Sequence, residues 1–375
     1  MKHFQEEGFC SSRKEPSHRG KKEAMMGVDL FILAGEVSGD NLGAELIRKL
    51  SDKKILAVAG PQMRKEKVEV LFPMEKLETM GFIDVLGSLP RIYKYFKRAR
   101  QAILEKNPKT VILIDYSDFN LALGRSLRKK GYNGKIVQYV CPSVWAWRKG
   151  RIKTLEKNFD LLLSILPFEK ECFEGRDIRV EYIGHPLLEK IETTNEKKEY
   201  LSIFPGSRQT EIERNLPLQI RVAKEISPYP IAISLSDEKM RPLVTKIAPD
   251  IEIFSKEKRY ELMQKSQAAI ATSGTVNLEL ALHRVPTVVT FAIKPLDLFI
   301  ARDLLRIRMP HFSLPNIIAK ERIFPELYGP NFTEENLTKE LKKILSTQTR
   351  IVKKCERVHA LVQDKNNPDF KGILL

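Results

Sequence analysis

Short apolar runs rich in β-branched residues alternate with helical stretches from Val28 onward. This alternation implies crossover connections and a mostly parallel sheet that helices cover on both faces. Helices are expected, for example, at Asn41–Leu50 and Ile92–Lys106. In the first half of the chain the pattern predicts strands at Asp29–Ala34, Ile55–Ala59, Thr110–Ile114, Lys135–Val140, Leu161–Leu166 and Val180–Ile183.

The alternation breaks at Leu188–Tyr200, LEKIETTNEKKEY, where apolar content falls and charge rises, as is typical of a linker. Beyond it the pattern restarts and predicts strands at Tyr200–Phe204, Ile231–Leu235, Ile251–Phe254, Ala268–Ala271 and Thr287–Phe291. The chain is therefore expected to hold two doubly wound, Rossmann-like α/β domains. Ligands of such sheets bind at the carboxyl ends of the strands.

The expected domain boundaries follow from these patterns. A chain of 375 residues has room for about two domains. We expect the first Rossmann-like domain at 27–190, a linker at 191–199, a second domain at 200–345 and a C-terminal segment at 346–375. Residues 1–26 mix charges throughout and lack the apolar core of a signal peptide, so they are expected to form a disordered tail.

Charge and cysteine usage narrow the class of protein. The formal net charge of +16 favours an anionic partner, which is phosphate, nucleic acid or an acidic lipid surface. The four cysteines, at positions 10, 141, 172 and 355, have neither metal-ligand nor redox spacing, which indicates reduced thiols in a cytosolic protein. No apolar run approaches the roughly 18 residues that a membrane-spanning helix requires.

The first strand of each predicted domain ends in a glycine turn that opens a helix. In the first turn, Gly35 and Gly39 are spaced G-x-x-x-G and not G-x-G-x-x-G, which disfavours a nicotinamide or flavin site. A tight strand-to-helix turn explains these glycines. Glu36 and Ser38 make the turn unusually polar, which raises the weight of a functional role.

The second turn, PGSR at Pro205–Arg208, has the chemistry of an anion site. Gly206 permits close approach of the backbone, and Ser207 leads into a helix whose first N–H groups are expected to point outward. Arg208 adds a permanent positive charge at that helix N-terminus. The turn therefore favours binding of a phosphate group.

The stretch ATSGTVNLELAL at Ala271–Leu282 repeats this arrangement. Ser273, Gly274 and Thr275 can offer backbone and hydroxyl donors to a diphosphate. Glu279 follows one turn later, where it can accept hydrogen bonds from ribose hydroxyls. The alternative is that the turn is a good helix cap and that Glu279 is a solvated glutamate. The presence of two anion turns in one domain argues against this alternative.

Asp115 lies at the carboxyl end of a predicted strand, in LIDYSDFN at Leu113–Asn120. A carboxylate in that position suits a general base, whereas Asp118 is expected to cap the next helix. No D-x-D motif occurs and histidines are few, so neither a metal site nor a cofactor is expected. A diphosphate leaving group would then be stabilised by Arg208 and helix N-termini.

The segment Met80–Lys106 places apolar residues before a basic, aromatic stretch. Apolar and aromatic groups beside a basic face are typical of soluble proteins that bind anionic lipid, and core packing with a solvated face explains the same letters equally well. The apolar residues are Phe82, Ile83, Val85, Leu86 and Leu89, and the others are Arg91, Tyr93, Lys94, Tyr95, Phe96, Lys97, Arg98 and Arg100.

Taken together, the motifs closely resemble the lipid-A-disaccharide synthase family. The resembling segments run in order from about Ala34 to Ala319, nearly the whole globular chain, and several are specific to the family. They are AGEVSGDNLGAELI, AVAGPQM, MGFIDVLGSLPRI, IDYSDFN, YVCPSVWAWRKGRI, LPFEKECF, YIGHPL, FPGSRQTEI, ATSGTVNLELAL and SLPNIIA.

The resemblance implies a GT-B fold, with two Rossmann-like domains facing a central cleft, and an inverting glycosyl transfer. UDP-2,3-diacylglucosamine would donate its sugar to the primary hydroxyl of 2,3-diacylglucosamine 1-phosphate (lipid X). The products would be UDP and a β-1,6-linked disaccharide 1-phosphate. The enzyme is expected in the cytoplasm. Because both substrates carry acyl chains, we expect it to be attached peripherally to the cytoplasmic face of the inner membrane.

The resemblance also assigns roles to residues. Asp115 matches the catalytic base, and Arg208 matches the residue on the departing diphosphate. Glu36 and Ser38 match the turn of the first, acceptor-side domain. The residues that match the nucleotide side of the second domain are Ser273, Gly274, Thr275, Glu279 and Asn316.

The sequence departs from the family pattern in places. Cys141 stands where a serine is expected, and the similar size of the two side chains predicts little effect. The final DKNNPDFKGILL carries no family signal, which leaves open a homodimer and the terminal helix that often crosses back to the first domain of GT-B folds.

Two alternatives to this function are kept. Another GT-B enzyme acting on a UDP-sugar, such as an epimerase or a peptidoglycan glycosyltransferase, would share the nucleotide site but not the diacylated acceptor. A nucleic-acid-binding protein would explain the charge. Against it, the basic and aromatic residues form no recognised nucleic-acid-binding module, so we expect no nucleic-acid partner.

Overall fold

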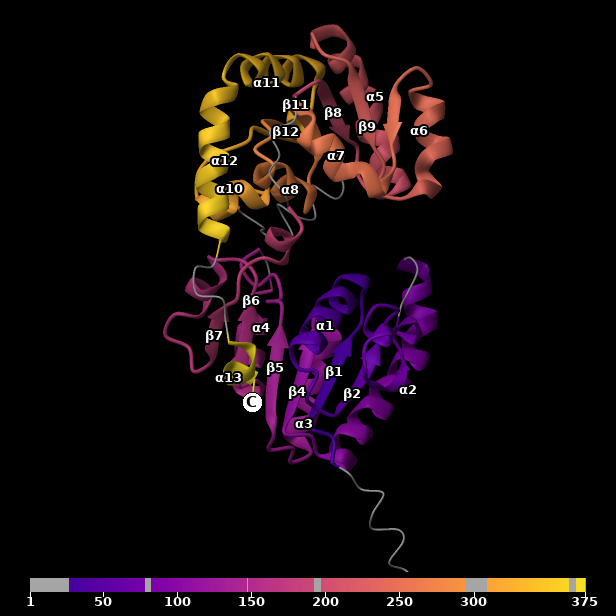
Figure 1. The fold of residues 1–375 in the computed structure, drawn as a ribbon, viewed down its shortest axis with the longest axis vertical. Helices are drawn as coiled ribbons and strands as arrows, with labels where there is room; N and C mark the ends of the chain where they lie inside the picture. The colour runs from indigo at the N-terminus through magenta and orange to yellow at the C-terminus, as the bar shows by residue number, and fades with distance from the viewer. Residues whose placement is uncertain are drawn as a thin grey trace, which may run out of the picture. The chain divides into compact units, whose positions relative to one another are not determined.

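The computed structural model describes residues 27–77, 82–146, 148–191, 197–293, 309–363 and 369–374, and the side chains of residues 82–88 lie outside this description. These residues form two parallel β-sheets with helices between successive strands (Figure 1). The central strands are covered on both faces, as is usual in parallel sheets. In β1, for example, every residue of LFILA is buried.

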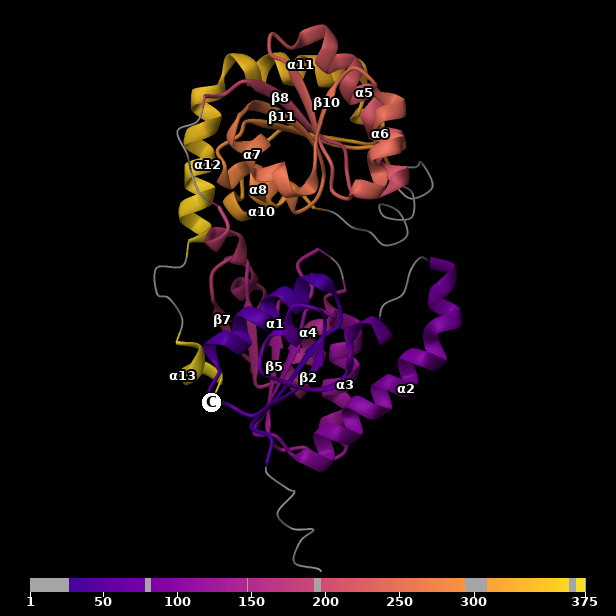
Figure 2. The same cartoon turned by 45° about the vertical axis from the view of Figure 1, so that its right-hand side comes forward.

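The first sheet has the strand order β3-β2-β1-β4-β5-β6-β7. Its strand order reverses between β1 and β4, as in doubly wound sheets. Its strands are β1 (Leu30–Ala34), β2 (Ile55–Ala59), β3 (Glu69–Pro73), β4 (Thr110–Ile114), β5 (Lys135–Tyr139), β6 (Leu161–Ser164) and β7 (Arg179–Tyr182). Its α-helices are α1 (Val37–Lys49), α2 (Phe82–Lys106), α3 (Ser117–Lys129) and α4 (Gly150–Asn158). Figure 2 shows α2 as the long helix that runs beside this sheet.

The second sheet has the order β10-β9-β8-β11-β12-β13, with its reversal between β8 and β11. Its strands are β8 (Tyr200–Phe204), β9 (Ile231–Ser234), β10 (Glu252–Phe254), β11 (Ser266–Thr272), β12 (Thr287–Phe291) and β13 (Glu326–Tyr328). Its helices are α5 (Gln209–Ile226), α6 (Arg241–Ile247), α7 (Arg259–Gln264), α8 (Val276–Leu282), α10 (Leu314–Ala319), α11 (Glu334–Ser346) and α12 (Gln348–Val362).

The predicted alternation of strands and helices is confirmed, and the ends of the predicted strands differ from the observed ones by at most two residues. The pattern misses β3, a half-exposed edge strand whose apolar run is only Val70–Phe72, and β13, which has three residues. Two helices begin earlier than predicted. α1 starts at Val37, and α2 starts at Phe82 and includes Pro90, although a proline usually marks a boundary.

The end of the chain contacts residues of the first sheet. The Tyr182 hydroxyl donates to the carbonyl oxygen of Val362, at the end of α12. Lys135 Nζ donates to the carbonyl oxygen of Ile373, 2.5 Å away, in the short helix α13 (Phe370–Leu374). Leu374 is fully buried there. These contacts place Val362 and the helix α13 beside residues of the first sheet, while the domain boundaries stay a prediction.

Candidate functional site

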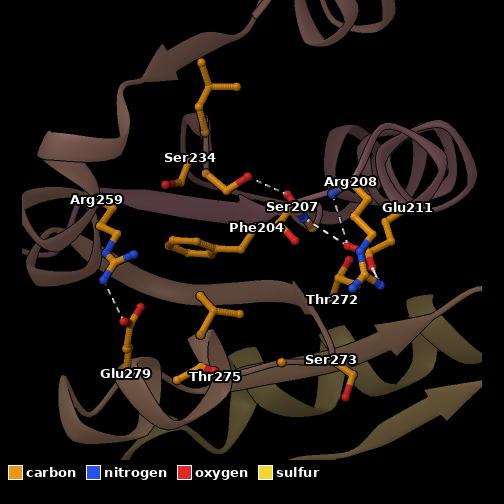
Figure 3. A pocket seen from close by; sticks show the side chains of 15 residues that line it. Phe204, Ser207, Arg208, Glu211, Ser234, Arg259, Thr272, Ser273, Thr275 and Glu279 are labelled. Atoms are coloured by element: carbon orange, nitrogen blue, oxygen red, sulfur yellow. Dashed lines mark hydrogen bonds and ion pairs between the residues drawn. The ribbon is translucent and has the colours of Figure 1, made fainter. Parts of the chain in front are cut away.

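A cavity of about 410 Å³ opens at the carboxyl ends of the central strands of the second sheet. It lies where the strand order reverses between β8 and β11, the usual ligand position in such sheets. Figure 3 shows side chains from several elements surrounding it. Its lining consists of Phe204, Gly206, Ser207, Arg208, Glu211, Ser234, Leu235, Ser236, Arg259, Thr272, Ser273, Gly274, Thr275, Val276 and Glu279.

The cavity brings together most of the residues that the sequence assigns to the second domain. Both glycine turns line it, and so does Glu279. In Figure 3, Arg259 and Glu279 lie toward one end, Arg208 and Glu211 lie toward the other, and Phe204 lies between them. The cavity therefore offers a cation beside an acid at each end and an aromatic ring in the middle.

At the PGSR turn, the two amides that precede α5 already have a partner. Those of Ser207 and Arg208 donate to Glu211 Oε2 at 3.0 and 3.3 Å, and the expected outward direction of the first N–H groups of α5 stays a prediction. Arg208 Nη1 also donates to Glu211 Oε1, at 3.3 Å. Sequence reasoning missed Glu211, although an acid three residues after the N-cap is the spacing of a capping box.

Arg208 nevertheless remains accessible to an anion in the cavity. Its side chain is 80% exposed, whereas that of Glu211 is 18% exposed. An ion pair with so exposed a partner is worth about 0–1 kcal/mol, so a more highly charged diphosphate can compete for the guanidinium. The ion pair with Glu211 therefore leaves the Arg208 guanidinium able to bind a diphosphate in the cavity.

Gly206 is required by the shape of this turn. Its φ is 116°, a conformation that residues with a Cβ rarely adopt. A Cβ there would lie 2.8 Å from Glu211 Oε2 and 2.9 Å from Glu211 Cβ. At Gly274, by contrast, an added Cβ would meet nothing within 4 Å.

Gly206→Ala is expected to lower the free energy of unfolding by about 1–3 kcal/mol, through backbone strain and displacement of Glu211. Gly274→Ala should change it by less than about 0.5 kcal/mol. Urea unfolding of both variants and the wild type measures the difference. Equal stability of the two variants would show that the conformation of Gly206 is not strained by a side chain.

The second turn leaves its polar groups facing the cavity. Gly274 and Thr275 are exposed, and Thr275 is the N-cap of α8 without a side-chain capping bond. Ser273 is anchored because its amide donates to the carbonyl oxygen of Thr290, 3.1 Å away. The turn can therefore offer hydroxyl and backbone donors to a ligand, as its sequence indicates.

Glu279 is buried and paired, so the alternative of a solvated glutamate is wrong. Its Oε1 accepts from Arg259 Nη2 at 2.7 Å and from the Tyr260 hydroxyl at 3.3 Å. Burial raises the pKa of Glu279, and the charge of Arg259 opposes that shift. Sequence reasoning missed Arg259 and Tyr260 because they begin α7, a helix without a recognisable motif.

Asn316 does not line the cavity. It is fully buried, and its side-chain oxygen accepts from the amides of Ile323 and Phe324 at 2.8 and 2.9 Å. Its side-chain nitrogen donates to the carbonyl oxygen of Phe324 at 2.8 Å. These bonds brace the loop between α10 and β13, and a nucleotide contact of Asn316 stays a prediction.

The site residues of the first sheet follow its strands, as expected. Asp115 comes directly after β4, is half-buried and has a φ of 46°. Its amide donates to the carbonyl oxygen of Tyr139, 3.0 Å away. Glu36 is the N-cap of α1, and Ser38 lies in its first turn; both are exposed.

Asp118 differs from its expected role as a helix cap. It lies in the first turn of α3, where its carboxylate accepts from Arg148 Nη1 at 3.0 Å and from Arg151 Nη2 at 2.5 Å. It therefore pairs with Arg151 in α4 and with Arg148, which precedes that helix.

In the described part of the chain, no three His, Cys, Asp or Glu side chains come close enough to hold a metal ion.

The family model and the curated relatives that match the chain agree on one family. A model of the lipid-A-disaccharide synthetase family matches residues 30–371. The lipid-A-disaccharide synthases of Chlamydia trachomatis serovar D and Geobacter sulfurreducens are 38% and 33% identical to the chain over 362 and 340 residues. These alignments cover 89% and 84% of this chain, and 60% and 87% of the relatives. The chain thus spans about 60% of the length of the chlamydial relative.

Solved structures show the fold. The glycotransferase of kitacinnamycin superposes with a TM-score of 0.59 at 10% identity, covering 90% of this chain and 95% of the other. A UDP-GlcNAc 2-epimerase from Neisseria meningitidis gives a TM-score of 0.55 at 11% identity, with coverages of 90% and 96%. At such identities the likeness concerns architecture alone. The expected GT-B fold, built on two parallel sheets, is confirmed.

Proposed function

The chain belongs to the lipid-A-disaccharide synthase family, and on that premise we propose that it is an inverting glycosyltransferase. Its donor is UDP-2,3-diacylglucosamine, and its acceptor is 2,3-diacylglucosamine 1-phosphate (lipid X). The observation that carries the proposal is the cavity at the switch point of the second sheet, where two anion turns and a buried acid meet. This combination suits a nucleoside diphosphate.

In the proposed reaction, the nucleotide lies in this cavity. Ser273, Thr275 and Arg208 contact the diphosphate, and Glu279 contacts the ribose. Asp115 takes the proton of the acceptor's primary hydroxyl, and that oxygen attacks the anomeric carbon of the donor sugar. The bond from the anomeric carbon to the diphosphate breaks, so UDP leaves with the bonding electrons while Arg208 stabilises the charge that develops. Configuration at the anomeric carbon inverts.

The direct test is to incubate the purified chain with both diacylated substrates and to measure UDP release and disaccharide formation. We expect UDP and disaccharide in equal amounts. UDP-GlcNAc without acyl chains serves as the control donor and should react poorly. Conversion of UDP-GlcNAc to an epimer, or transfer to a non-acylated acceptor, would favour another GT-B enzyme instead.

We expect activity without a divalent metal ion. Neither a D-x-D motif nor a close group of three metal-ligating side chains occurs in the described residues, and Arg208 supplies a fixed positive charge for the diphosphate. Turnover measured with and without EDTA should agree within about twofold. Full loss with EDTA, restored specifically by magnesium or manganese, would contradict this proposal.

A peripheral membrane position is also proposed, because both substrates carry acyl chains. None of the described helices combines the length and apolar composition needed to cross a bilayer. On α2, Leu89 and Tyr93 are 51% and 57% exposed, and Arg91 and Lys94 are exposed beside them. Lys97 Nζ lies 4.5 Å from the centre of the Tyr93 ring. The expected contribution of Phe82–Ser88 lies outside the described side chains.

Sedimentation with anionic vesicles tests this surface. The wild type should bind at low salt and less at high salt, since each nearby Lys or Arg adds about 1 kcal/mol of attraction to anionic lipid. A Leu89→Ser/Tyr93→Ser variant should bind at least about 10-fold more weakly, because buried apolar groups contribute roughly 0.8 kcal/mol per CH₂.

Leu361→Ser is the matched control, because this leucine on α12 is 40% exposed but has no place in the proposed surface. It should bind vesicles like the wild type. Equal binding by the double variant would remove α2 from the membrane contact. No binding by the wild type at any salt concentration would remove the membrane position itself, including the proposed attachment at the cytoplasmic face of the inner membrane.

A further inference from the structure

Four side chains, from α7, α8 and the C-cap of α8, form a cluster beside one end of the cavity. Arg259 and Tyr260 are the first residues of α7, and Glu279 lies on α8. Arg259 Nη2 is 2.7 Å from Glu279 Oε1 and 2.9 Å from the Tyr260 hydroxyl oxygen. The rings of Tyr260 and His283 lie 5.4 Å apart. The guanidinium of Arg259 stands over the Tyr260 ring, 4.7 Å from its centre.

The hydrogen bonds of this cluster are unevenly distributed over the carboxylate. Both described donors, Arg259 Nη2 and the Tyr260 hydroxyl, reach Oε1 of Glu279. Within the described part of the chain, no donor contacts Oε2. Glu279 lines the cavity and the residue as a whole is 4% exposed, so its second oxygen is an acceptor that a ligand in the cavity can use.

A buried carboxylate needs a partner to stay ionised. Burial raises the pKa of Glu279, and Arg259 gives the strongest opposing effect, followed by the hydrogen bond from Tyr260. Removing Arg259 would therefore weaken the charge of Glu279 and free its side chain to rotate. An acceptor is strongest when it is ionised and fixed in direction.

We propose that Arg259, assisted by Tyr260, is a positioning residue that holds Glu279 with Oε2 turned to the vicinal hydroxyls of the nucleotide's ribose. Arg259 itself lines the cavity but acts through Glu279. This inference rests on the proposed function, because it takes a ribonucleotide as the ligand. Its consequence is a preference for a ribonucleotide over a deoxyribonucleotide.

Calorimetric titration with UDP, 2′-deoxy-UDP and 3′-deoxy-UDP tests this role. The wild type should bind UDP at least about 10-fold more tightly than the weaker deoxy analogue, as expected for a hydrogen bond to a charged group. Arg259→Met should weaken UDP about 10-fold and that analogue little, so their affinity ratio falls toward one. Arg259→Lys should restore part of the ratio, because it keeps the charge without the planar fork.

Tyr260→Phe is a second, milder variant in case Arg259→Met does not fold. It removes only the hydroxyl and should lower the ratio in the same direction, by a smaller factor. Arg241→Met is the matched control, since Arg241 forms a 2.7 Å ion pair with Glu238 on the surface of the same domain and does not line the cavity. Its affinities should equal those of the wild type.

The outcomes separate this inference from the proposed function. An unchanged ratio in folded Arg259→Met or Tyr260→Phe overturns the positioning role while leaving the nucleotide site in place. An equal loss for all three nucleotides also overturns it, because Arg259 would then act through general charge or stability. If the wild type does not bind UDP, the proposed function fails, and the inference fails with it.

Discussion

Arg208→Ala is expected to lower kcat by about 10²–10³-fold, the usual cost of losing one group that stabilises developing charge. The departing diphosphate gains charge as its bond to the sugar breaks, and Arg208 is the guanidinium that the PGSR turn places at the cavity. The guanidinium stands at the start of α5, 80% exposed, and its described partner is Glu211. Turnover is measured as UDP release with both diacylated substrates at saturation.

The stability of this variant should hardly change, because so exposed an ion pair contributes at most about 1 kcal/mol. Arg208→Lys should recover part of the lost rate, since a lysine keeps the charge but lacks the planar fork. Arg221→Ala is the control. Arg221 lies on the same helix, is 65% exposed and pairs with Glu334 at 2.9 Å. Normal turnover by Arg208→Ala would remove this residue from the mechanism.

Local sequence patterns predict the fold well because parallel sheets need continuous apolar strands. β2, β4, β8 and β12 have the predicted ends, and each is almost fully buried. The same logic finds the cavity, since a glycine turn after a central strand must lie at the carboxyl edge of the sheet. The edge strand β3 is harder to recognise, because its apolar run is only Val70–Phe72 and part of the strand faces solvent.

What the patterns miss are pairings between separate elements. The sequence indicates Glu279 as a ligand-binding acid, but its partner Arg259 lies 20 positions earlier, on another helix. Glu211 accepts hydrogen bonds from the amides of Ser207 and Arg208, which are its neighbours in the sequence. The same residues are equally compatible with an open anion site. Asn316 belongs to a matching motif, and only the structure shows its three bonds to the Ile323–Phe324 backbone.

Asp115→Asn is expected to lower kcat by about 10²–10⁴-fold, the usual contribution of a general base. Asparagine keeps the size of the side chain but cannot take the proton of the acceptor hydroxyl. The choice of asparagine matters because Asp115 has a φ of 46°. Asparagine and aspartate tolerate this left-handed region, whereas alanine would add about 1–2 kcal/mol of backbone strain and mix two effects.

Two measurements isolate the proton acceptor. UDP affinity should stay within about twofold of wild type, since the proposed nucleotide cavity is lined by residues 204–279 of the second sheet and its helices. Asp118→Asn, three residues away, removes a carboxylate that is 72% exposed and paired with Arg148 and Arg151, and it should leave turnover close to normal. If both asparagine variants turn over at similar rates, Asp115 is not the base. If Asp115→Asn alone fails while binding UDP normally, the carboxylate acts in the chemical step and not in holding the nucleotide.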